Sequence, residues 1–216
     1  MDGVPLPPGR EVTVGPTGVP LPGNLAVPDG AFGLVLFAHG SGSSRHSPRN
    51  RFVAEVLQRA GLATLLFDLL TEDEARDRGN VFDIPLLADR LTAAAASAAD
   101  LPAVAELPVG FFGASTGAGA ALWAAAEPSA RVGAVVSRGG RPDLAAERLG
   151  QVTAPTLLIV GERDTAVIQM NLEAQSMMRC TADLQIVPGA THLFEEPGTL
   201  QTAATLARDW FVRYLT

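Results

Sequence analysis

Short apolar runs alternate with helical segments along most of the chain, and this alternation constrains the fold more than any other feature. A run such as Gly33–Ala38 is apolar throughout, which predicts a strand buried on both faces of a parallel sheet. The predicted strands are Gly33–Ala38, Leu62–Leu66, Val109–Phe112, Val132–Val136, Thr156–Val160 and Leu184–Val187. The predicted helices are Arg49–Ala60, Asp83–Ala99, Ala118–Ala126, Leu144–Leu149, Val167–Met178 and Leu200–Tyr214. This order predicts an α/β fold, with helices on both faces of a mostly parallel central sheet.

The chain has 216 residues, a length typical of one domain. Residues 1–30 are rich in Pro and Gly and contain two strand candidates, Glu11–Val14 and Leu21–Val27, which we expect at the sheet edge. Neither an internal repeat nor an interdomain linker is visible. We therefore predict a single α/β domain over residues 1–216.

All 16 basic side chains of the chain are arginine, and lysine is absent. This excludes a lysine Schiff base and a Walker-type phosphate loop, because both need a lysine. Cys180 is the single cysteine, which excludes an internal disulfide and a cysteine-built zinc site. A histidine-built metal site would need nearly all of the three histidines, so we expect neither a metal nor a cofactor.

The net charge of −7 argues against nucleic acid and anionic membranes as partners. The N-terminus shows no basic segment followed by an apolar run, and no stretch approaches the ~18 apolar residues of a membrane span. We therefore expect a cytoplasmic location and a small-molecule substrate as the partner, with the oligomeric state left open.

A serine stands between two glycines in Gly113-Ala114-Ser115-Thr116-Gly117, where a predicted strand runs directly into a predicted helix. A serine on such a sharp turn adopts strained backbone angles, and the residues two positions away must have almost no side chain. The turn exposes the Ser115 hydroxyl above the helix N-terminus, whose dipole favours developing negative charge. Small residues also occur at such junctions for packing alone, but the flanking strand and helix favour a nucleophile.

A nucleophilic serine needs a base and a group that orients the base. His192 follows the last predicted strand, and Asp164 follows the strand before it. Because the carboxyl ends of parallel strands meet at one edge of a sheet, we expect Ser115, Asp164 and His192 to come together there. Asp164 could instead cap the next helix, in which case Glu162 or, less directly, Asp143 is the alternative acid.

The loop after Gly33–Ala38 reads His39-Gly40-Ser41-Gly42 and lies at the same edge. A tetrahedral intermediate needs two preorganised N–H donors, one from the residue after the nucleophile and one from such a loop. We predict the N–H groups of Thr116 and Ser41 as these donors, with Gly42 as a substitute for Ser41 and a candidate contact to the substrate. We expect His39 to be structural.

Other residues near the carboxyl ends of the strands are candidates for binding the substrate. An alternative interpretation of the apolar candidates is that they belong to the core. Arginines in the segment 45–51 and at positions 138 and 141 could hold a carboxylate or phosphate, but we expect most of them to pair with acids. The tentative substrate-binding residues are Gly42, Leu69, Leu70, Phe82, Arg138 and Phe194.

Taken together, these motifs resemble the α/β-hydrolase superfamily, and the closest branch is that of the dienelactone-hydrolase-like proteins. The resemblance extends from about Leu21 to the C-terminus and implies an α/β-hydrolase fold with Ser115 as nucleophile, Asp164 as acid and His192 as base. Many members insert a lid between two strands that here are only nineteen residues apart, from Val136 to Thr156. The resemblance therefore implies an open site without a cap domain.

Dienelactone hydrolases carry a cysteine at the nucleophile position, whereas this chain has a serine, which favours general ester cleavage. We predict a serine esterase that uses an acyl-enzyme intermediate and acts on short-chain or aryl esters, because an open site buries a long acyl chain poorly. A lactonase, thioesterase or acyltransferase would use the same triad, and a non-catalytic ligand-binding hydrolase fold is a further alternative. Relatives are sometimes joined to phosphoribosyltransferase domains, and we expect no such domain within these residues.

Overall fold

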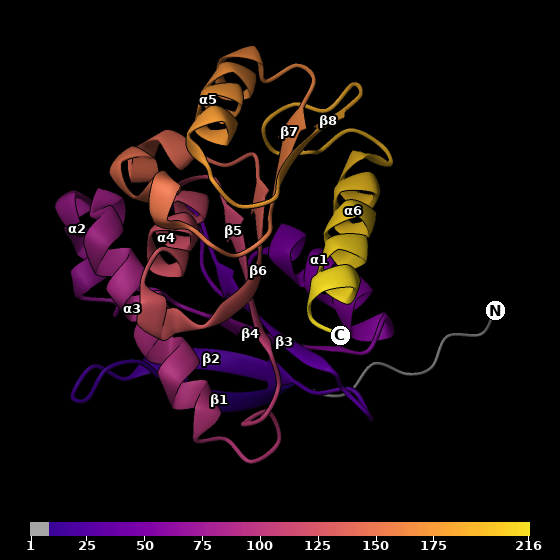
Figure 1. Ribbon diagram of the computed structural model, residues 1–216. Coiled ribbons are helices and arrows are strands. Elements are labelled where there is room, and N and C mark those ends of the chain that lie inside the picture. The colour runs from indigo at the N-terminus through magenta and orange to yellow at the C-terminus, as the bar shows by residue number, and fades with distance from the viewer. Residues whose placement is uncertain (1–8) are drawn as a thin grey trace.

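Eight strands form one sheet in the computed structural model, which describes residues 9–216 (Figure 1). The strand order is β1-β2-β4-β3-β5-β6-β7-β8, with β3 to β8 parallel and with β1 and β2 antiparallel to their neighbours. The strands are β1 (Arg10–Val14), β2 (Leu21–Ala26), β3 (Gly33–Ala38), β4 (Leu62–Phe67), β5 (Val109–Ala114), β6 (Val132–Arg138), β7 (Thr156–Gly161) and β8 (Ala182–Val187). The mostly parallel sheet is confirmed, and the predicted N-terminal strands lie at its β1 edge.

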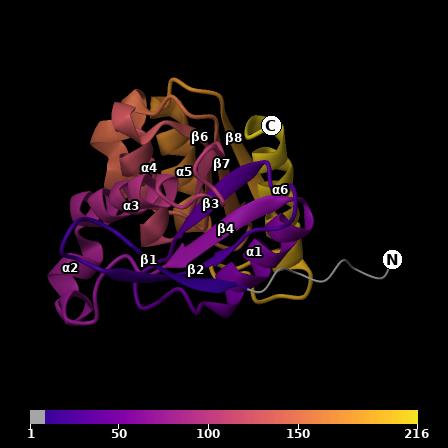
Figure 2. The ribbon, with the colours of Figure 1, turned by 90° about the horizontal axis from the view of Figure 1, so that it is seen from below.

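Helices cover both faces of this sheet, as predicted (Figures 1 and 2). Helices α1 and α6 pack on one face, while α3 and α4 pack on the other. The α-helices are α1 (Pro48–Arg59), α2 (Arg78–Phe82), α3 (Ile84–Ala99), α4 (Thr116–Ala125), α5 (Thr165–Met177) and α6 (Thr199–Tyr214). The 3-10 helices are η1 (Glu74–Arg76), η2 (Pro128–Ala130) and η3 (Pro142–Gln151).

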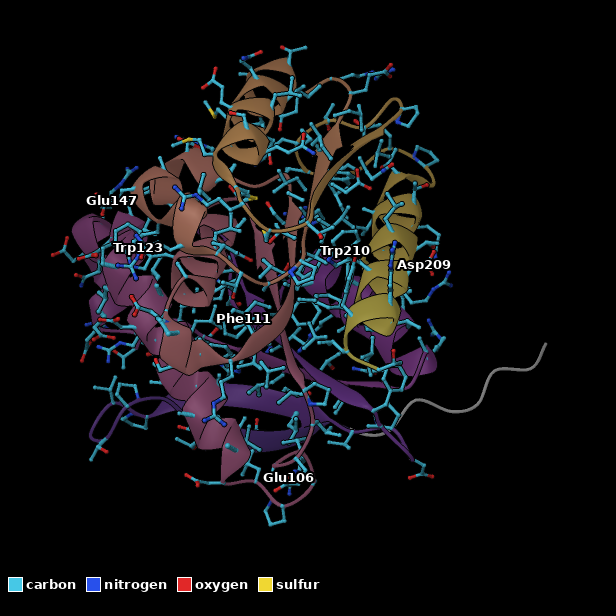
Figure 3. All side chains as sticks on the ribbon, viewed as in Figure 1. Glu106, Phe111, Trp123, Glu147, Asp209 and Trp210 are labelled. Carbon is cyan, nitrogen blue, oxygen red and sulfur yellow. The ribbon has the colours of Figure 1, made fainter. Side chains whose placement is uncertain are left out.

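The continuous apolar runs divide their side chains between two cores. In β3, Leu34 and Leu36 pack on the α3–α4 side, whereas Val35 and Phe37 pack on the α1–α6 side. Alternate side chains of a strand point to opposite faces, so both faces of β3 must be apolar. The two tryptophans follow the same division, with Trp123 on α4 and Trp210 on α6 (Figure 3).

The segment between β6 and β7 contains only η3 within the described residues, so no separate cap covers the carboxyl ends of the strands. The helix predicted at Leu144–Leu149 lies within this 3-10 segment, which is kinked at Ala145, where φ is −113° and ψ is 17°. Helix α2 and η1 were not predicted, because the polar segment that forms them shows no helical periodicity.

No helix within residues 9–216 is long and apolar enough to cross a bilayer. The cytoplasmic location stays a prediction. The predicted domain span begins at residue 1, and residues 1–8 lie outside the described residues.

Candidate active site

Ser115 occupies the single-residue turn between β5 and α4. Its backbone has φ 52° and ψ −122°, a region that side-chain-bearing residues rarely adopt. Backbone hydrogen bonds hold it there: the Ser115 N–H donates to the carbonyl of Arg138 at 3.2 Å, and the Arg141 N–H donates to the carbonyl of Ser115 at 3.1 Å. The loop after β6 therefore fixes the turn that exposes the hydroxyl.

The two glycines that flank the serine are required by close backbone approach. A Cβ atom at Gly113 would lie 2.4 Å from the Cα of Ala118, and one at Gly117 would lie 2.2 Å from the carbonyl oxygen of Ala38. Both distances are far below van der Waals contact with atoms that cannot move aside. The glycine spacing therefore allows α4 to begin directly against the ends of β3 and β5.

The loops after β7 and β8 bring Asp164 and His192 to this serine. His192 Nε2 lies 3.3 Å from Ser115 Oγ, and His192 Nδ1 lies 2.6 Å from Asp164 Oδ2. This arrangement fits the tautomer in which Nδ1–H donates to the carboxylate and Nε2 accepts the serine proton. The Asp164 side chain makes no capping hydrogen bond to α5, although the residue precedes that helix. Its carboxylate is thus directed at the imidazole rather than at the helix.

The alternative acids have other partners. Glu162 Oε2 accepts the N–H of Gly189 at 2.7 Å, which holds the turn after β8. Asp143 accepts two hydrogen bonds from the guanidinium of Arg141, at 2.7 and 2.8 Å. Neither carboxylate is hydrogen-bonded to His192, so the geometry favours Asp164 as the orienting acid.

The predicted oxyanion donors lie side by side next to the serine. The Ser41 N–H donates to Thr116 Oγ1 at 2.8 Å, which ties the loop after β3 to the start of α4. The Thr116 N–H is at the first position of α4, where an intrahelical acceptor does not exist. An oxyanion placed here would accept a hydrogen bond from the Thr116 N–H. It would also accept from the Ser41 N–H, either in place of Thr116 Oγ1 or together with it. Gly42, the substitute donor, has φ +68° and lies one residue further along the loop.

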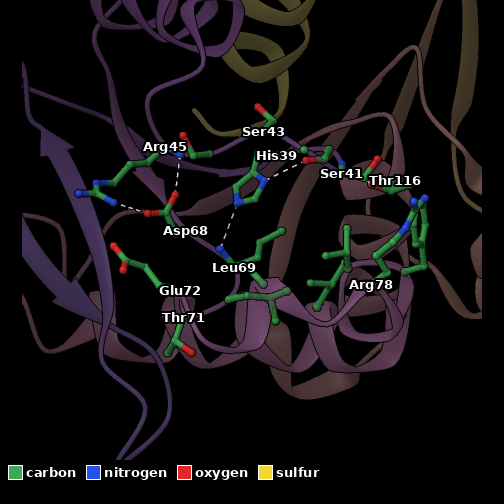
Figure 4. Close-up of a pocket in the computed structure, with 18 of the residues that line it drawn as sticks. His39, Ser41, Ser43, Arg45, Asp68, Leu69, Thr71, Glu72, Arg78 and Thr116 are labelled. Atoms are coloured by element: carbon green, nitrogen blue, oxygen red, sulfur yellow. Dashed lines mark hydrogen bonds and ion pairs between the residues drawn. The ribbon is translucent and has the colours of Figure 1, made fainter.

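His39 connects the loop after β3, which carries the predicted oxyanion donor Ser41 and is called the oxyanion loop below, to the loop after β4. Its Nδ1 donates to the carbonyl of Gly40 at 3.0 Å, and its Nε2 accepts the N–H of Leu69 at 3.2 Å (Figure 4). Burial lowers the pKa of this imidazole, despite the opposing effects of the Gly40 carbonyl and the Asp68 charge. A neutral ring fixed by two backbone bonds fits the predicted structural role of His39.

A cavity of about 720 Å³ lies on the β4 side of the oxyanion loop (Figure 4). Its apolar wall comes from the segment after β4 and from α2. The lining includes Gly42 and Thr116 together with Leu69, Leu70, Val81, Phe82 and Leu87. Four tentative substrate-binding residues, at positions 42, 69, 70 and 82, thus line one cavity. Phe82 is 48% exposed.

A second, smaller cavity of about 270 Å³ contains Ser115 and His192 in its wall. Arg138 lines this cavity, and the loop residues at positions 40, 41 and 43 line both cavities. Phe194 lines neither of them, contrary to the prediction. Its positive φ of 56° directs the ring back into the α1–α6 core, where it is 2% exposed and lies 5.5 Å below the Arg138 guanidinium.

Most of the other arginines near the site have partners, as expected. Arg45 forms an ion pair with Asp68, and Arg141 forms one with Asp143. Arg51 contacts the imidazole of His46 at 2.9 Å. Over residues 9–216, no three His, Cys, Asp or Glu side chains gather in a way that could hold a metal ion.

The sequence profile of the family described as "Alpha/beta hydrolase domain" matches residues 32–208. The chain belongs to the alpha/beta hydrolase family. A solved structure described as dienelactone hydrolase from Anabaena variabilis is 57% identical to this hydrolase, with a TM-score of 0.95, and the match covers 98% of this chain and 100% of that one.

More distant solved structures share the hydrolase fold. Est1E from Butyrivibrio proteoclasticus is 16% identical, with a TM-score of 0.80, and the match covers 94% of this chain and 98% of that one. The Pyrococcus furiosus esterase Pf2001 is 18% identical, with a TM-score of 0.75, and the match covers 96% of this chain and 93% of that one. At these identities the likeness shows the fold alone.

Two curated Mycobacterium tuberculosis proteins from different strains, each named "Putative phosphoribosyl transferase", are 62% identical to this hydrolase over 205 residues. The match covers 95% of this chain but 46% of those proteins. The chain therefore spans about half the length of these curated relatives.

Two residues near this candidate site were missed by the sequence analysis. Glu196 Oε2 accepts the N–H of Thr191 at 3.0 Å, which fixes the loop that carries the imidazole and lowers the pKa of the carboxyl. Asn50, at the start of α1, is 2% exposed and lines the smaller cavity. No pattern marks either residue, because the fold decides which loop Glu196 holds and that Asn50 lines a cavity.

Proposed function

We propose that this protein is a serine hydrolase that cleaves carboxylic esters through an acyl-enzyme intermediate. The observation that carries the proposal is the hydrogen-bonded chain from Ser115 Oγ through His192 to Asp164, with distances of 3.3 and 2.6 Å. The N–H groups of Ser41 and Thr116 stand beside it. These are the parts that acyl transfer to a serine requires.

In the proposed reaction, His192 Nε2 takes the proton of Ser115 as its Oγ attacks the ester carbonyl. The Ser41 and Thr116 N–H groups stabilise the oxyanion of the tetrahedral intermediate. The C–O bond of the ester then breaks, and the departing alcohol takes the proton from His192. A water molecule, deprotonated by the same imidazole, attacks the acyl-enzyme. The acyl–Oγ bond then breaks, His192 returns the proton to Ser115 Oγ and the acid leaves, while Asp164 keeps the ring oriented.

The shape of the larger cavity supports short-chain or aryl esters as substrates. Its apolar lining includes the buried Leu69 and Leu70 and the half-exposed Phe82. An acyl chain longer than this wall would extend into water and would not gain the ~0.8 kcal/mol of each buried methylene. A lactone is the second candidate substrate, because the 57% identical structure is described as a dienelactone hydrolase.

The name of the curated relatives does not contradict this proposal. The proposed triad lies within the region that they share with this chain, which is 46% of their length. We therefore propose ester hydrolysis for the shared region alone.

A series of p-nitrophenyl esters from acetate to decanoate tests the proposal, with dihydrocoumarin as a lactone probe. We expect kcat/KM to peak at short acyl chains and to fall by at least about 10³-fold in Ser115→Ala. Ser176→Ala, on the exposed side of α5, is the matched control and should hydrolyse these esters at the wild-type rate. Absence of ester and lactone hydrolysis by the folded wild-type protein would favour a non-catalytic binder, and a peak at long chains would contradict the short-chain proposal.

A further inference from the structure

A buried guanidinium without an acidic partner stands beside the proposed nucleophile. Arg138 is the last residue of β6 and is only 6% exposed. Its Nε has no hydrogen-bond partner within residues 9–216, and its contact is with the Phe194 ring. Buried charges are normally paired, since removal of a charge from water is costly. An unpaired one in a cavity wall therefore points to a missing anion.

The Arg138 side chain remains charged in this setting. Burial, and to a smaller extent the charge of Arg49, lowers its pKa to about 10. That value is still well above neutral pH, so the guanidinium is protonated when the site is empty.

A second arginine lines the same wall. Arg49 lines the smaller cavity, and its one acidic contact within residues 9–216 is at 3.4 Å with the exposed Glu195. Among the residues that line this cavity there is neither an aspartate nor a glutamate. The wall thus presents two guanidinium groups to whatever occupies the space.

The position of the imidazole indicates which half of an ester enters this space. His192 Nε2 must reach the departing oxygen to protonate it, and His192 lines only the smaller of the two cavities. The larger cavity, which carries the apolar wall, includes Ser41 and Thr116 in its lining, where the acyl carbonyl would be held. The acyl portion therefore faces the larger cavity, and the alcohol portion faces Arg138.

We propose that the smaller cavity is an anion subsite, and that the substrate is an ester whose alcohol portion carries a carboxylate or a phosphate bound by Arg138 and Arg49. This inference rests on the proposed ester hydrolysis. A planar guanidinium binds either anion through paired hydrogen bonds. The volume of about 270 Å³ limits the alcohol portion to a small group.

Matched butyrate esters test the subsite. The anionic ester is 4-(butyryloxy)benzoate, its neutral isostere is 4-(butyryloxy)benzamide, and 4-(butyryloxy)phenyl phosphate supplies the phosphate arm. We expect the wild-type kcat/KM for at least one anionic ester to exceed that for the benzamide by about tenfold or more. The anionic ester with the larger ratio of kcat/KM to that of the benzamide shows whether the subsite prefers a carboxylate or a phosphate. A ratio near one or below for both anions would overturn the proposal.

Variants of Arg138 and Arg49 test whether these two residues cause the preference for anionic esters. The ratio should fall at least about fivefold in Arg138→Gln and in Arg49→Gln. Arg49 lies near the surface, so we expect Arg49→Gln to fold. This variant therefore tests the subsite even if Arg138→Gln does not fold. Arg59→Gln, which removes an exposed arginine from the other end of α1, should keep the wild-type ratio. Retention of the ratio in folded Arg138→Gln or Arg49→Gln would overturn the assignment.

A binding measurement separates failure of the subsite from failure of the esterase proposal. Calorimetric titration of Ser115→Ala should show 4-hydroxybenzoate or 4-hydroxyphenyl phosphate binding at least about tenfold more tightly than 4-hydroxybenzamide. The preference should be lost when Arg49→Gln is added. Loss of hydrolysis with retained anion binding would overturn only the esterase proposal. Ser115-dependent hydrolysis without an anion preference would overturn only the subsite.

Discussion

The carboxylate of Asp164 acts on the proposed chemistry only through the imidazole, because it lies 2.6 Å from His192 Nδ1 and has no capping bond to α5. Its role is to keep Nε2 directed at Ser115 and to balance the charge that His192 gains. Glu162, two residues earlier, is instead used by the backbone of Gly189. One hydrogen bond of each carboxylate therefore distinguishes the two acids: Asp164 bonds the imidazole, and Glu162 bonds a backbone N–H.

Replacement of Asp164 with Asn should lower kcat by about 10³–10⁴-fold, because the amide favours the wrong imidazole tautomer. Steady-state kinetics with p-nitrophenyl butyrate provide the measurement. Glu162→Gln is the matched control, for which we expect a loss below about tenfold. Similar losses in the two variants would show that Asp164 is not the orienting acid.

His39 should make stability depend on pH. Its pKa lies below 6.5 in the folded state because of burial, so the unfolded chain takes up a proton at a higher pH than the folded one. The free energy of unfolding should therefore fall as the pH falls from 6.5 towards the folded-state pKa, by up to about 1.4 kcal/mol per pH unit.

Urea unfolding of the wild type and of His39→Gln at pH 7.5 and pH 5.5 measures this dependence. The wild type should lose more stability than the variant between the two pH values, since the remaining groups titrate in both. An equal loss in the two proteins would show that His39 does not contribute.

At the residue scale, sequence reasoning could predict Ser115, because its flanking glycines stand between a predicted strand and a predicted helix, where a nucleophile turn needs them. It could not predict that Phe194 points away from the cavities. A residue in a loop has no periodicity, and the positive φ that turns this ring into the core is a tertiary effect. The lack of an acidic partner for Arg138 within the described residues could not be predicted from the sequence either, because the fold decides which acids lie near this arginine.

The junction of β5 and α4 is the element on which the site depends. The helix begins immediately at Thr116, and its first turn lies against the end of β3. Strands such as β3 could be predicted because a strand buried on both sides must be apolar throughout. Helix α2 could not be predicted, although it supplies Val81 and Phe82 to the larger cavity. The shape of that cavity could therefore not be predicted from the sequence.

A methyl group at Gly117 should disrupt this junction. Gly117→Ala would place a Cβ atom 2.2 Å from the carbonyl oxygen of Ala38, and we expect a destabilisation of about 1–3 kcal/mol or more. Gly150→Ala is the control, since the nearest atom to its Cβ would be 3.7 Å away. Urea unfolding compares them, and equal stability of the two variants would contradict the close approach.

The molecule as a whole places two cavities of different character on either side of one loop. The larger is bounded by apolar side chains after β4, and the smaller contains the proposed nucleophile and base. The short connection between β6 and β7 leaves both without a separate cap within the described residues. The absence of a cap could be predicted from chain length, but the division into two cavities could not.

Truncation of Phe82 tests which cavity holds the acyl group. Phe82→Ala should lower kcat/KM for p-nitrophenyl butyrate by about two- to fivefold more than for the acetate, because the longer chain loses apolar contact. Leu172→Ala, an exposed apolar residue on α5, serves as the control. An equal effect of Phe82→Ala on both esters would place the acyl group elsewhere.

Covalent labelling tests the central claim most directly. A fluorophosphonate probe reacts with a serine hydroxyl only when a neighbouring base activates it, and peptide mapping by mass spectrometry identifies the modified residue. We predict modification of Ser115 in the wild type and a rate at least about 100-fold lower in His192→Ala. A folded wild-type protein that stays unlabelled at Ser115, or one labelled equally fast without His192, would contradict the account.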